Sequence, residues 1–172
     1  MKRIIFLAVI AFISLLTLAS CARQSVKQAP PTPYPFTIQT FSGLELNNDF
    51  NHRDLLLGIQ HNWQDDPNGV EFFTGLNVTR LGILIDGNYA DPLTYFNDAP
   101  TTGEIYKFMQ KYPQVKANGE AESPYLCNES IFIEELYVDQ NDVTAELKRD
   151  FVEFCRNPEE IVTYDGLDAW WD

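Results

Sequence analysis

Histidine, serine and carboxylate side chains carry most acid–base and nucleophilic catalysis, and this sequence offers few arrangements of them. Its two histidines are His52 and His61, and their nine-residue separation matches no metal-binding pattern such as His-Glu-x-x-His. Ser42, His52 and Asp54 can be drawn as a triad, but a chain of this size offers such a trio by chance. The sequence contains no Gly-x-Ser-x-Gly elbow, phosphate loop or dinucleotide fingerprint. It therefore predicts no catalytic residue, no metal site and no cofactor.

A calcium loop is the nearest approach to a metal motif. The segment DQNDVTAELKRD, residues 139–150, opens with the right residue types. Its sixth position is Thr144 instead of the glycine that the sharp turn requires, and its twelfth is Asp150 instead of glutamate. We expect Asn141 or Asp142 to cap a helix here.

The cysteine at position 21 carries the most specific signal in the sequence. It follows an uncharged, mostly apolar run, residues 4–18, which is preceded by Lys2 and Arg3. A positive start, a short apolar core and small residues are typical of a secretory signal. The alternative, an uncleaved membrane anchor, is disfavoured because a spanning helix needs about 20 apolar residues.

The end of this segment resembles the lipobox of bacterial lipoproteins. It reads Leu18-Ala19-Ser20-Cys21, an aliphatic residue and two small residues before a cysteine. The resemblance implies that Cys21 receives diacylglycerol on its thiol, that the chain is cut before it, and that a fatty acid such as palmitate is added to the new N-terminus. More than one acyl chain gives stable membrane anchoring. Ala22 replaces the aspartate typical of inner-membrane retention, which implies the outer membrane.

Cleavage before Cys21 would divide the chain into three parts. Residues 1–20 are the signal peptide, residues 21–35 are the lipidated cysteine with a proline-rich tether, and residues 36–172 are one globular domain. The tether cannot form a packed core, and an extended chain of this length spans roughly 40 Å at about 3.1 Å per residue.

The two remaining cysteines, Cys127 and Cys155, are expected to form a disulfide. An even pair in an exported domain favours a bridge. Closing a loop of about 29 residues would stabilise the fold by roughly 3–4 kcal/mol in the chain-entropy model.

The charge of the chain restricts its partners. With 12 Lys and Arg and 25 Asp and Glu, the net charge is −13. Removal of Lys2 and Arg3 with the signal changes it to −15. Such a surface repels nucleic acid and attracts cationic partners, so we expect a protein partner of basic character and no nucleic acid. Solubility in a crowded envelope is the simpler reading of the same charge.

The C-terminal segment EEIVTYDGLDAWWD, residues 159–172, combines five acids with aromatic residues and contains no base. Tryptophan and tyrosine dominate the hot spots of protein interfaces. The candidate partner-binding residues are Tyr164, Asp165, Asp168, Trp170 and Trp171. The alternative is that this segment packs on the domain as a last strand.

Hydrophobic periodicity predicts the elements that must position these residues. Strands are expected at residues 36–41, 55–63, 70–73, 76–81, 83–85 and 130–138, with a hairpin over 55–73. Helices are expected at 102–112, begun by Thr101 or Thr102, and at 142–156. The fold class is α+β, a single domain with an antiparallel sheet, about two helices in the C-terminal half and one disulfide.

These expectations favour a non-catalytic outer-membrane lipoprotein that faces the periplasm. It would serve as a protein-binding accessory in the assembly of an envelope or secretion complex, attached to the membrane through Cys21. The first alternative is an acidic immunity or inhibitor protein that neutralises a cationic toxin or lysozyme. The second is a small periplasmic hydrolase.

Lipidation is tested by the substitution Cys21→Ala. The variant is expected to incorporate no labelled palmitate and to lose the fatty-acid mass of the mature protein, because the acceptor thiol is gone. Ser20→Ala is the matched control, since it keeps a small residue at the neighbouring position and should label normally. Label retained by Cys21→Ala would exclude this attachment point.

Overall fold

The computed structural model describes residues 42–126 and 131–171. The chain divides into residues 1–34 and a compact unit, residues 35–172, to which the described residues belong. Cys21, the tether, Cys127 and the strand expected at 36–41 lie outside the described residues. No helix in the described ranges has the length and apolarity needed to cross a bilayer.

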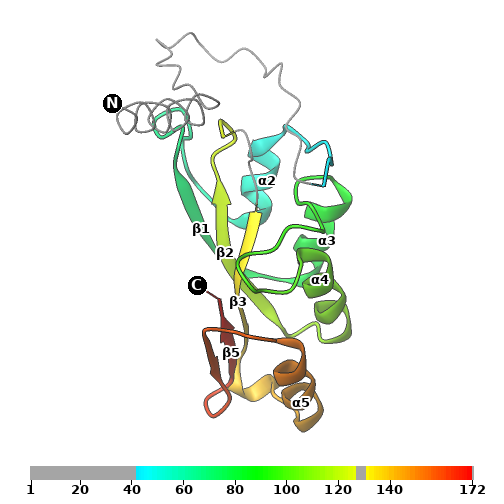
Figure 1. Cartoon of the computed structure of the whole chain (residues 1–172). Coiled ribbons are helices and arrows are strands. Elements are labelled where there is room, and N and C mark those ends of the chain that lie inside the picture. Colours follow the sequence, from blue (N-terminus) through cyan, green and yellow to red (C-terminus); the bar gives the residue numbers. More distant parts are fainter. Residues whose placement is uncertain (1–41, 127–130, 172) are drawn as a thin grey trace, which may run out of the picture. The chain divides into compact units, whose positions relative to one another are not determined.

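An antiparallel sheet and a layer of helices form the compact unit (Figure 1). The sheet has five strands in the order β1-β2-β3-β5-β4. In sequence, the elements are α2 (Phe50–Leu57), β1 (Val70–Leu76), α3 (Val78–Asp86), α4 (Thr102–Lys111), β2 (Lys116–Glu122), β3 (Ile131–Val138), the 3₁₀ turn η1 (Gln140–Asp142), α5 (Ala145–Phe154), β4 (Glu160–Val162) and β5 (Leu167–Trp170). This arrangement confirms the expected α+β class.

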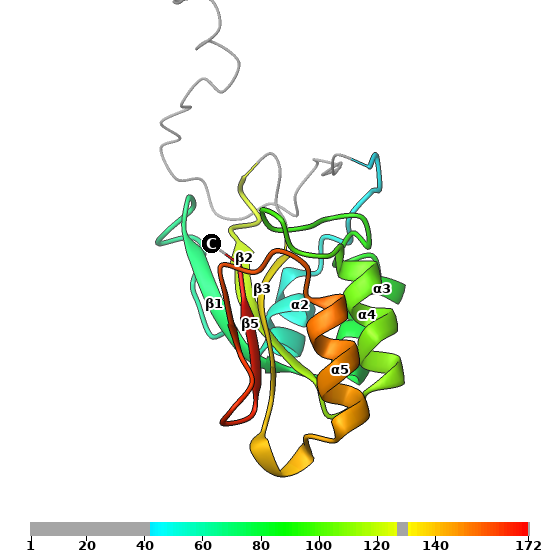
Figure 2. The same ribbon diagram turned by 60° about the horizontal axis from the view of Figure 1, so that its bottom comes forward.

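The four helices lie on one face of the sheet, and the core is packed between the two layers (Figure 2). Strand β2 shows the division most plainly, because its buried positions are Ala117, Gly119 and Ala121 while the positions between them are half-buried. Side chains alternate between the two faces of a strand. Among the described residues, no helix covers the second face of the sheet (Figure 2).

The elements predicted in the C-terminal half are confirmed. Helix α4 begins with a capping box, in which Thr101 and Glu104 each accept a hydrogen bond from the other's backbone N–H. Strand β3 occupies the predicted segment. Helix α5 is also present, but its cap is Thr144, whose hydroxyl accepts from the Leu147 N–H at 3.1 Å. The expected caps, Asn141 and Asp142, lie instead in the 3₁₀ turn η1, which precedes Thr144 in the sequence.

The strand predicted at 55–63 is wrong, and so is the hairpin that it was to start. Helix α2 covers the first part of this segment, capped by Asp49 and ended by Gly58, whose φ of 78° is left-handed. Two of its four buried residues are charged, Arg53 and Asp54. This charged pair occupies core positions and interrupts the apolar stripe by which a helix is recognised in a sequence. Without that stripe, the leucines that follow Asp54 in the sequence match the pattern of a strand.

Two further predictions in the N-terminal half need correction. Residues 76–85 form the end of β1 and helix α3, because the Asn77 side chain accepts from the Arg80 N–H and starts a helix. Strand β2, with the sequence KANGEAE, was not predicted because it lacks the β-branched and aromatic residues of ordinary strands. Its Gly119 is required, since a Cβ there would lie 2.0 Å from the Phe132 carbonyl oxygen.

The buried pair in α2 fastens that helix to the sheet. The Arg53 Nε donates to Asp54 Oδ1 at 2.8 Å, and Arg53 Nη1 donates to the backbone oxygen of Glu122 at 3.1 Å. The indole of Trp63 donates to Asp54 Oδ2 at 2.7 Å, and its ring lies 5.5 Å from the guanidinium. Both charges are thus satisfied inside the domain, as buried ions must be.

The expected disulfide remains a prediction, because Cys127 lies outside the described residues. Cys155 follows the last turn of α5 and is buried. Burial, and after it the charge of Asp168, raises the pKa of the Cys155 thiol. In the reduced protein this thiol would be protonated and unreactive.

Loss of the buried carboxylate should destabilise the domain strongly. Asp54→Ala removes the carboxylate that pairs with the buried Arg53 guanidinium and accepts the Trp63 indole N–H, and breaking a buried ion pair typically costs about 3–5 kcal/mol. The control is Asp139→Ala, which removes an exposed pair with Lys116 and should cost less than about 1 kcal/mol. Urea unfolding followed by fluorescence measures both, and equal midpoints for the two variants would contradict the role of Asp54.

Candidate functional site

Each of the three residues that could be drawn as a triad has a different hydrogen-bond partner. The hydroxyl of Ser42 donates to Asp91, while His52 Nδ1 lies 3.1 Å from the hydroxyl of Tyr89. Asp54 is committed to the buried network in α2. Among the described residues, no hydrogen bond joins Ser42, His52 and Asp54 to one another, so the trio is not linked as a catalytic triad would be.

The second histidine, His61, is held by neighbouring side chains of the domain. His61 Nδ1 lies 2.7 Å from Glu71 Oε1, and its ring lies 4.5 Å from that of Trp63. Across residues 42–126 and 131–171, no group of three or more histidine, cysteine, aspartate or glutamate side chains is arranged to hold a metal ion.

Several carboxylates gather on the open face of the sheet. They come from four neighbouring strands, β2, β3, β4 and β5. We call this surface the acidic face, and it consists of Glu120, Glu122, Glu134, Glu135, Glu160 and Asp168. Cross-strand pairing assembles it, since Glu135 and Glu160 both lie opposite Trp170 on β5.

A β-bulge places two consecutive glutamates on this face. The register between β2 and β3 shifts between Asn118, which pairs with Glu135, and Gly119, which pairs with Ile133. Glu134 is the additional residue, and both glutamates are half-buried where strict alternation would bury one of them. The close approach of β3 at this point is possible because residue 119 has no side chain.

Asp168 is the most strongly perturbed carboxyl of the face. Its pKa is raised to about 6, first by partial burial and then by the charge of Glu135, by a hydrogen bond to Glu135 and by the charge of Glu160. Neighbouring carboxylates disfavour one another's ionisation because like charges repel. At neutral pH this part of the face therefore holds charge at an energetic cost.

The carboxyls on β2 show the same effect more weakly. Burial raises the pKa of Glu120, opposed by a hydrogen bond to Glu134, and burial together with the charge of Glu120 raises the pKa of Glu122. The amide of Asn118 donates to Glu135 Oε2 at 2.6 Å. Lys116, the basic residue of β2, lies opposite Tyr137, which is itself opposite Asp168, so it is on the same side of the sheet as the acidic face; its ammonium pairs with Asp139.

Exposed aromatic residues flank the acidic face. Phe72 on β1 lies opposite Glu120 and is 68% exposed. Trp170 on β5 lies opposite Glu135 and is 39% exposed. Large aromatic side chains beside charged groups are characteristic of protein interfaces, where they supply most of the binding free energy.

The structure divides the five residues predicted from the C-terminal segment. Asp168 and Trp170 lie on the acidic face. Tyr164, 84% exposed, and Asp165 lie in the turn between β4 and β5. Trp171 is buried, and its indole donates to the Arg156 carbonyl at 3.3 Å, so its expected partner contact is wrong. The alternative that this segment packs on the domain is confirmed, because it forms two strands of the sheet.

The sequence prediction missed the glutamates of β2 and β3. The alternation of glutamate with alanine in residues 120–122 was the one local signal for them, since it places acids on one face of a strand. Their proximity to Asp168 had no local signal, because it depends on the pairing of β3 with β5.

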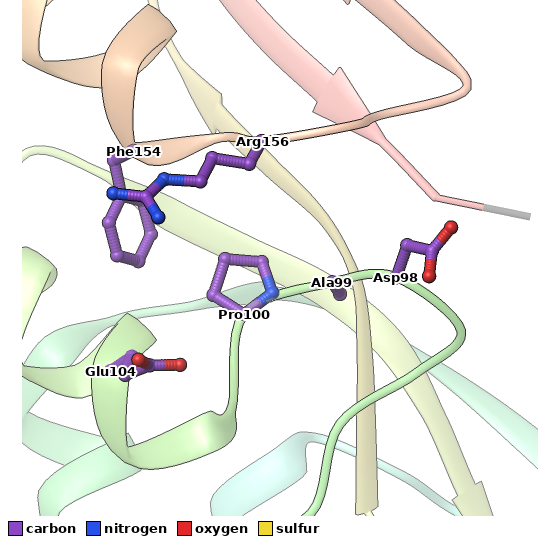
Figure 3. Close-up of a pocket in the computed structure, with 6 residues that line it drawn as sticks. All are labelled: Asp98, Ala99, Pro100, Glu104, Phe154 and Arg156. Carbon is purple, nitrogen blue, oxygen red and sulfur yellow. The ribbon is translucent and has the colours of Figure 1, made fainter.

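A hollow lies on the helix side of the domain (Figure 3). It encloses about 240 Å³ between the loop before α4 and the end of α5, and its lining residues are Asp98, Ala99, Pro100, Glu104, Phe154 and Arg156. Glu104 is occupied as a helix cap: hydrogen bonds from Thr101 lower its pKa most, and the charge of Arg156 adds to this. The volume is below the range of about 300–1,000 Å³ typical of small-molecule sites, so the hollow does not define a ligand site.

Comparison with known proteins adds no functional assignment. No protein-family model matches the sequence, and no curated protein or solved structure matches it significantly. Function must therefore be inferred from the residues themselves.

The perturbed carboxyl predicts how stability varies with pH. The pKa of Asp168 is about 6 in the folded protein and near 3.9 in an unfolded chain, so the folded state binds more protons between these values. The contribution of Asp168 therefore opposes folding above pH 6 and disappears as the pH falls toward 4.

Asp168→Asn should remove this contribution. We expect the variant to be more stable at pH 7 by about 1 kcal/mol, less than the full pKa shift would give because solvent screens a half-buried group. As the pH falls from 6 to 4, the stability difference between the variant and the parent should shrink to zero. Asp165→Asn in the neighbouring turn is the control, and urea unfolding at a series of pH values measures both; a variant less stable than the parent at pH 7 would refute the repulsion.

Proposed function

We propose that this protein is a non-catalytic, lipid-anchored protein of the outer membrane whose acidic face binds a basic protein partner. In this role it is an accessory in the assembly of an envelope or secretion complex, held at the membrane through Cys21 and facing the periplasm. The observation that carries the binding role is the gathering of six carboxylates from four strands on the uncovered face of the sheet.

A basic partner would relieve the repulsion that this face contains. Lysine or arginine side chains placed against Asp168 would lower the pKa of this carboxyl, and the protein would release protons on binding. Association should therefore tighten as the pH rises through about 6, the pKa of Asp168 in the free protein. The overall net charge of −13 would also accelerate encounter with a cationic protein.

The aromatic residues beside the carboxylates favour a protein over a small cation. Phe72 and Trp170 offer apolar area on two sides of the acidic face. A protein can cover these rings and pair with the charges in one interface.

Neutralisation of a cationic toxin or lysozyme is the second candidate function. The same acidic surface favours it, because inhibitors of basic proteins use complementary charge for rapid association. The two functions differ in what the protein holds. An assembly accessory remains within a large membrane complex after mild detergent extraction. Affinity purification of an inhibitor would instead recover a soluble basic protein bound to it. A hydrolase would show turnover in a substrate screen without either partner.

Paired substitutions separate the acidic face from the overall charge. The double variant Glu135→Gln with Asp168→Asn should reduce partner recovery by about tenfold or more, since hydrogen bonds between charged groups contribute about 1.5–3 kcal/mol each. The control is the double variant Glu146→Gln with Glu153→Gln. It removes the same amount of charge from exposed positions of α5, on the helix side of the domain. Affinity purification from detergent-solubilised envelopes, with partners identified by mass spectrometry at low and moderate salt, measures both.

Two outcomes would exclude this surface. Full recovery with the acidic-face variant would remove it from the interface, and equal losses with both variants would show a response to net charge alone. Point substitutions are required here, because deletion of residues 159–172 would remove β4 and β5 from the sheet.

A further inference from the structure

The loop between α3 and α4 holds two large apolar side chains in solvent. Leu93 is 63% exposed and Tyr95 is 60% exposed. They alternate with side chains that point inward, because Phe96 packs against the core with its ring 6.0 Å from that of Phe132.

The exposure of these side chains is imposed by an ordered backbone. The Leu93 N–H donates to Asp91 Oδ1 at 2.9 Å, and Asp91 is itself buried. The carbonyl of Thr94 accepts from both the N–H and the hydroxyl of Thr102, at 2.8 and 3.1 Å. An ordered loop that keeps apolar side chains out of the core marks a contact surface, because exposed apolar area is otherwise unfavourable.

The described chain begins at this same loop. The Ser42 hydroxyl donates to Asp91 Oδ2, the second oxygen of the carboxylate that binds the Leu93 N–H. A few residues later, the Asn47 N–H donates to the Asn88 carbonyl at 2.8 Å. Residues 42–49 and the α3–α4 loop therefore lie at one end of the domain, and the turn between β4 and β5 lies at the other (Figure 2).

We propose that Leu93 and Tyr95 contact the phospholipid bilayer to which the chain is anchored. The inference rests on the proposed lipidation of Cys21 and goes beyond the partner-binding role of the acidic face. Residues 22–41 separate the anchor from Ser42, and the chain joins the domain beside these two side chains. The end of the domain that the tether reaches first therefore presents its apolar residues to the membrane.

Because the tether already holds the domain at the membrane, even a weak contact between the α3–α4 loop and the bilayer would be populated. The chain between Cys21 and Ser42, which includes the tether, would span at most roughly 60 Å if it were extended, so the domain stays near the surface at a high effective concentration. A leucine contributes apolar area, and a tyrosine places its ring in the apolar boundary and its hydroxyl among the headgroups. Glu45 and Asp98 are exposed in the neighbouring segments, so zwitterionic lipids should be preferred over anionic ones.

Tryptophan reporters test this contact in the mature, lipidated protein. The protein is reconstituted in phosphatidylcholine vesicles whose acyl chains carry bromine, which quenches tryptophan fluorescence. Tyr95→Trp should add fluorescence that falls by at least about twofold in these vesicles, because interfacial side chains reach about 5–10 Å into the acyl boundary. Tyr164→Trp is the matched control at the opposite end, 84% exposed in the parent, and its added fluorescence should be unchanged.

Three further readouts decide the interpretation. Quenching of Tyr95→Trp should persist at high salt, since the contact is apolar, and should be lost when Leu93→Asp is added. A protein that does not float with vesicles has no lipid anchor, which overturns both the anchoring and this inference. A protein that floats while Tyr95→Trp stays unquenched, or is quenched no more than Tyr164→Trp, keeps its anchor and overturns the bilayer contact; the loop would then face a protein.

Discussion

The uncovered face of the sheet is the constraint on which the other features of this protein depend. Four helices cover one face, so the inward positions of β2 and β3 are alanine, glycine and aliphatic residues. Because side chains alternate along a strand, the outward positions meet solvent or a partner. Half of these positions on β2 and β3 are carboxylates, and the hydrophobic stabilisation of the opposite side must offset their mutual repulsion.

The local chemistry of that face follows from one glycine and one bulge. Gly119 lets β3 approach so closely that a Cβ would collide with the Phe132 carbonyl. The register shift beside it brings Glu134 and Glu135 to the same surface, next to Asp168 on the following strand. A strictly regular ladder would have turned one of the two glutamates toward the helices, where an unpaired charge is very unfavourable. The bulge thus raises the charge density of the open face.

Charge also explains where sequence reasoning failed. In α2 the core-facing positions include Arg53 and Asp54, which satisfy each other and bind Trp63 and the end of β2. A search for apolar periodicity cannot recognise a helix whose buried side is an ion pair. In α4 and α5 the buried positions are apolar and the caps are threonines, so the same reasoning located both helices within a few residues.

The sequence by itself determined the net charge, the helices of the C-terminal half, strand β3 and the expectation of a lipid anchor at Cys21, because each depends on neighbouring residues. Only the tertiary structure decided that Trp170 is exposed and Trp171 buried, and that Asp168 lies beside Glu135. These outcomes depend on the pairing register of β3 with β5. A shift by one residue would exchange the two faces of β5, and no local pattern in the C-terminal segment specifies that register.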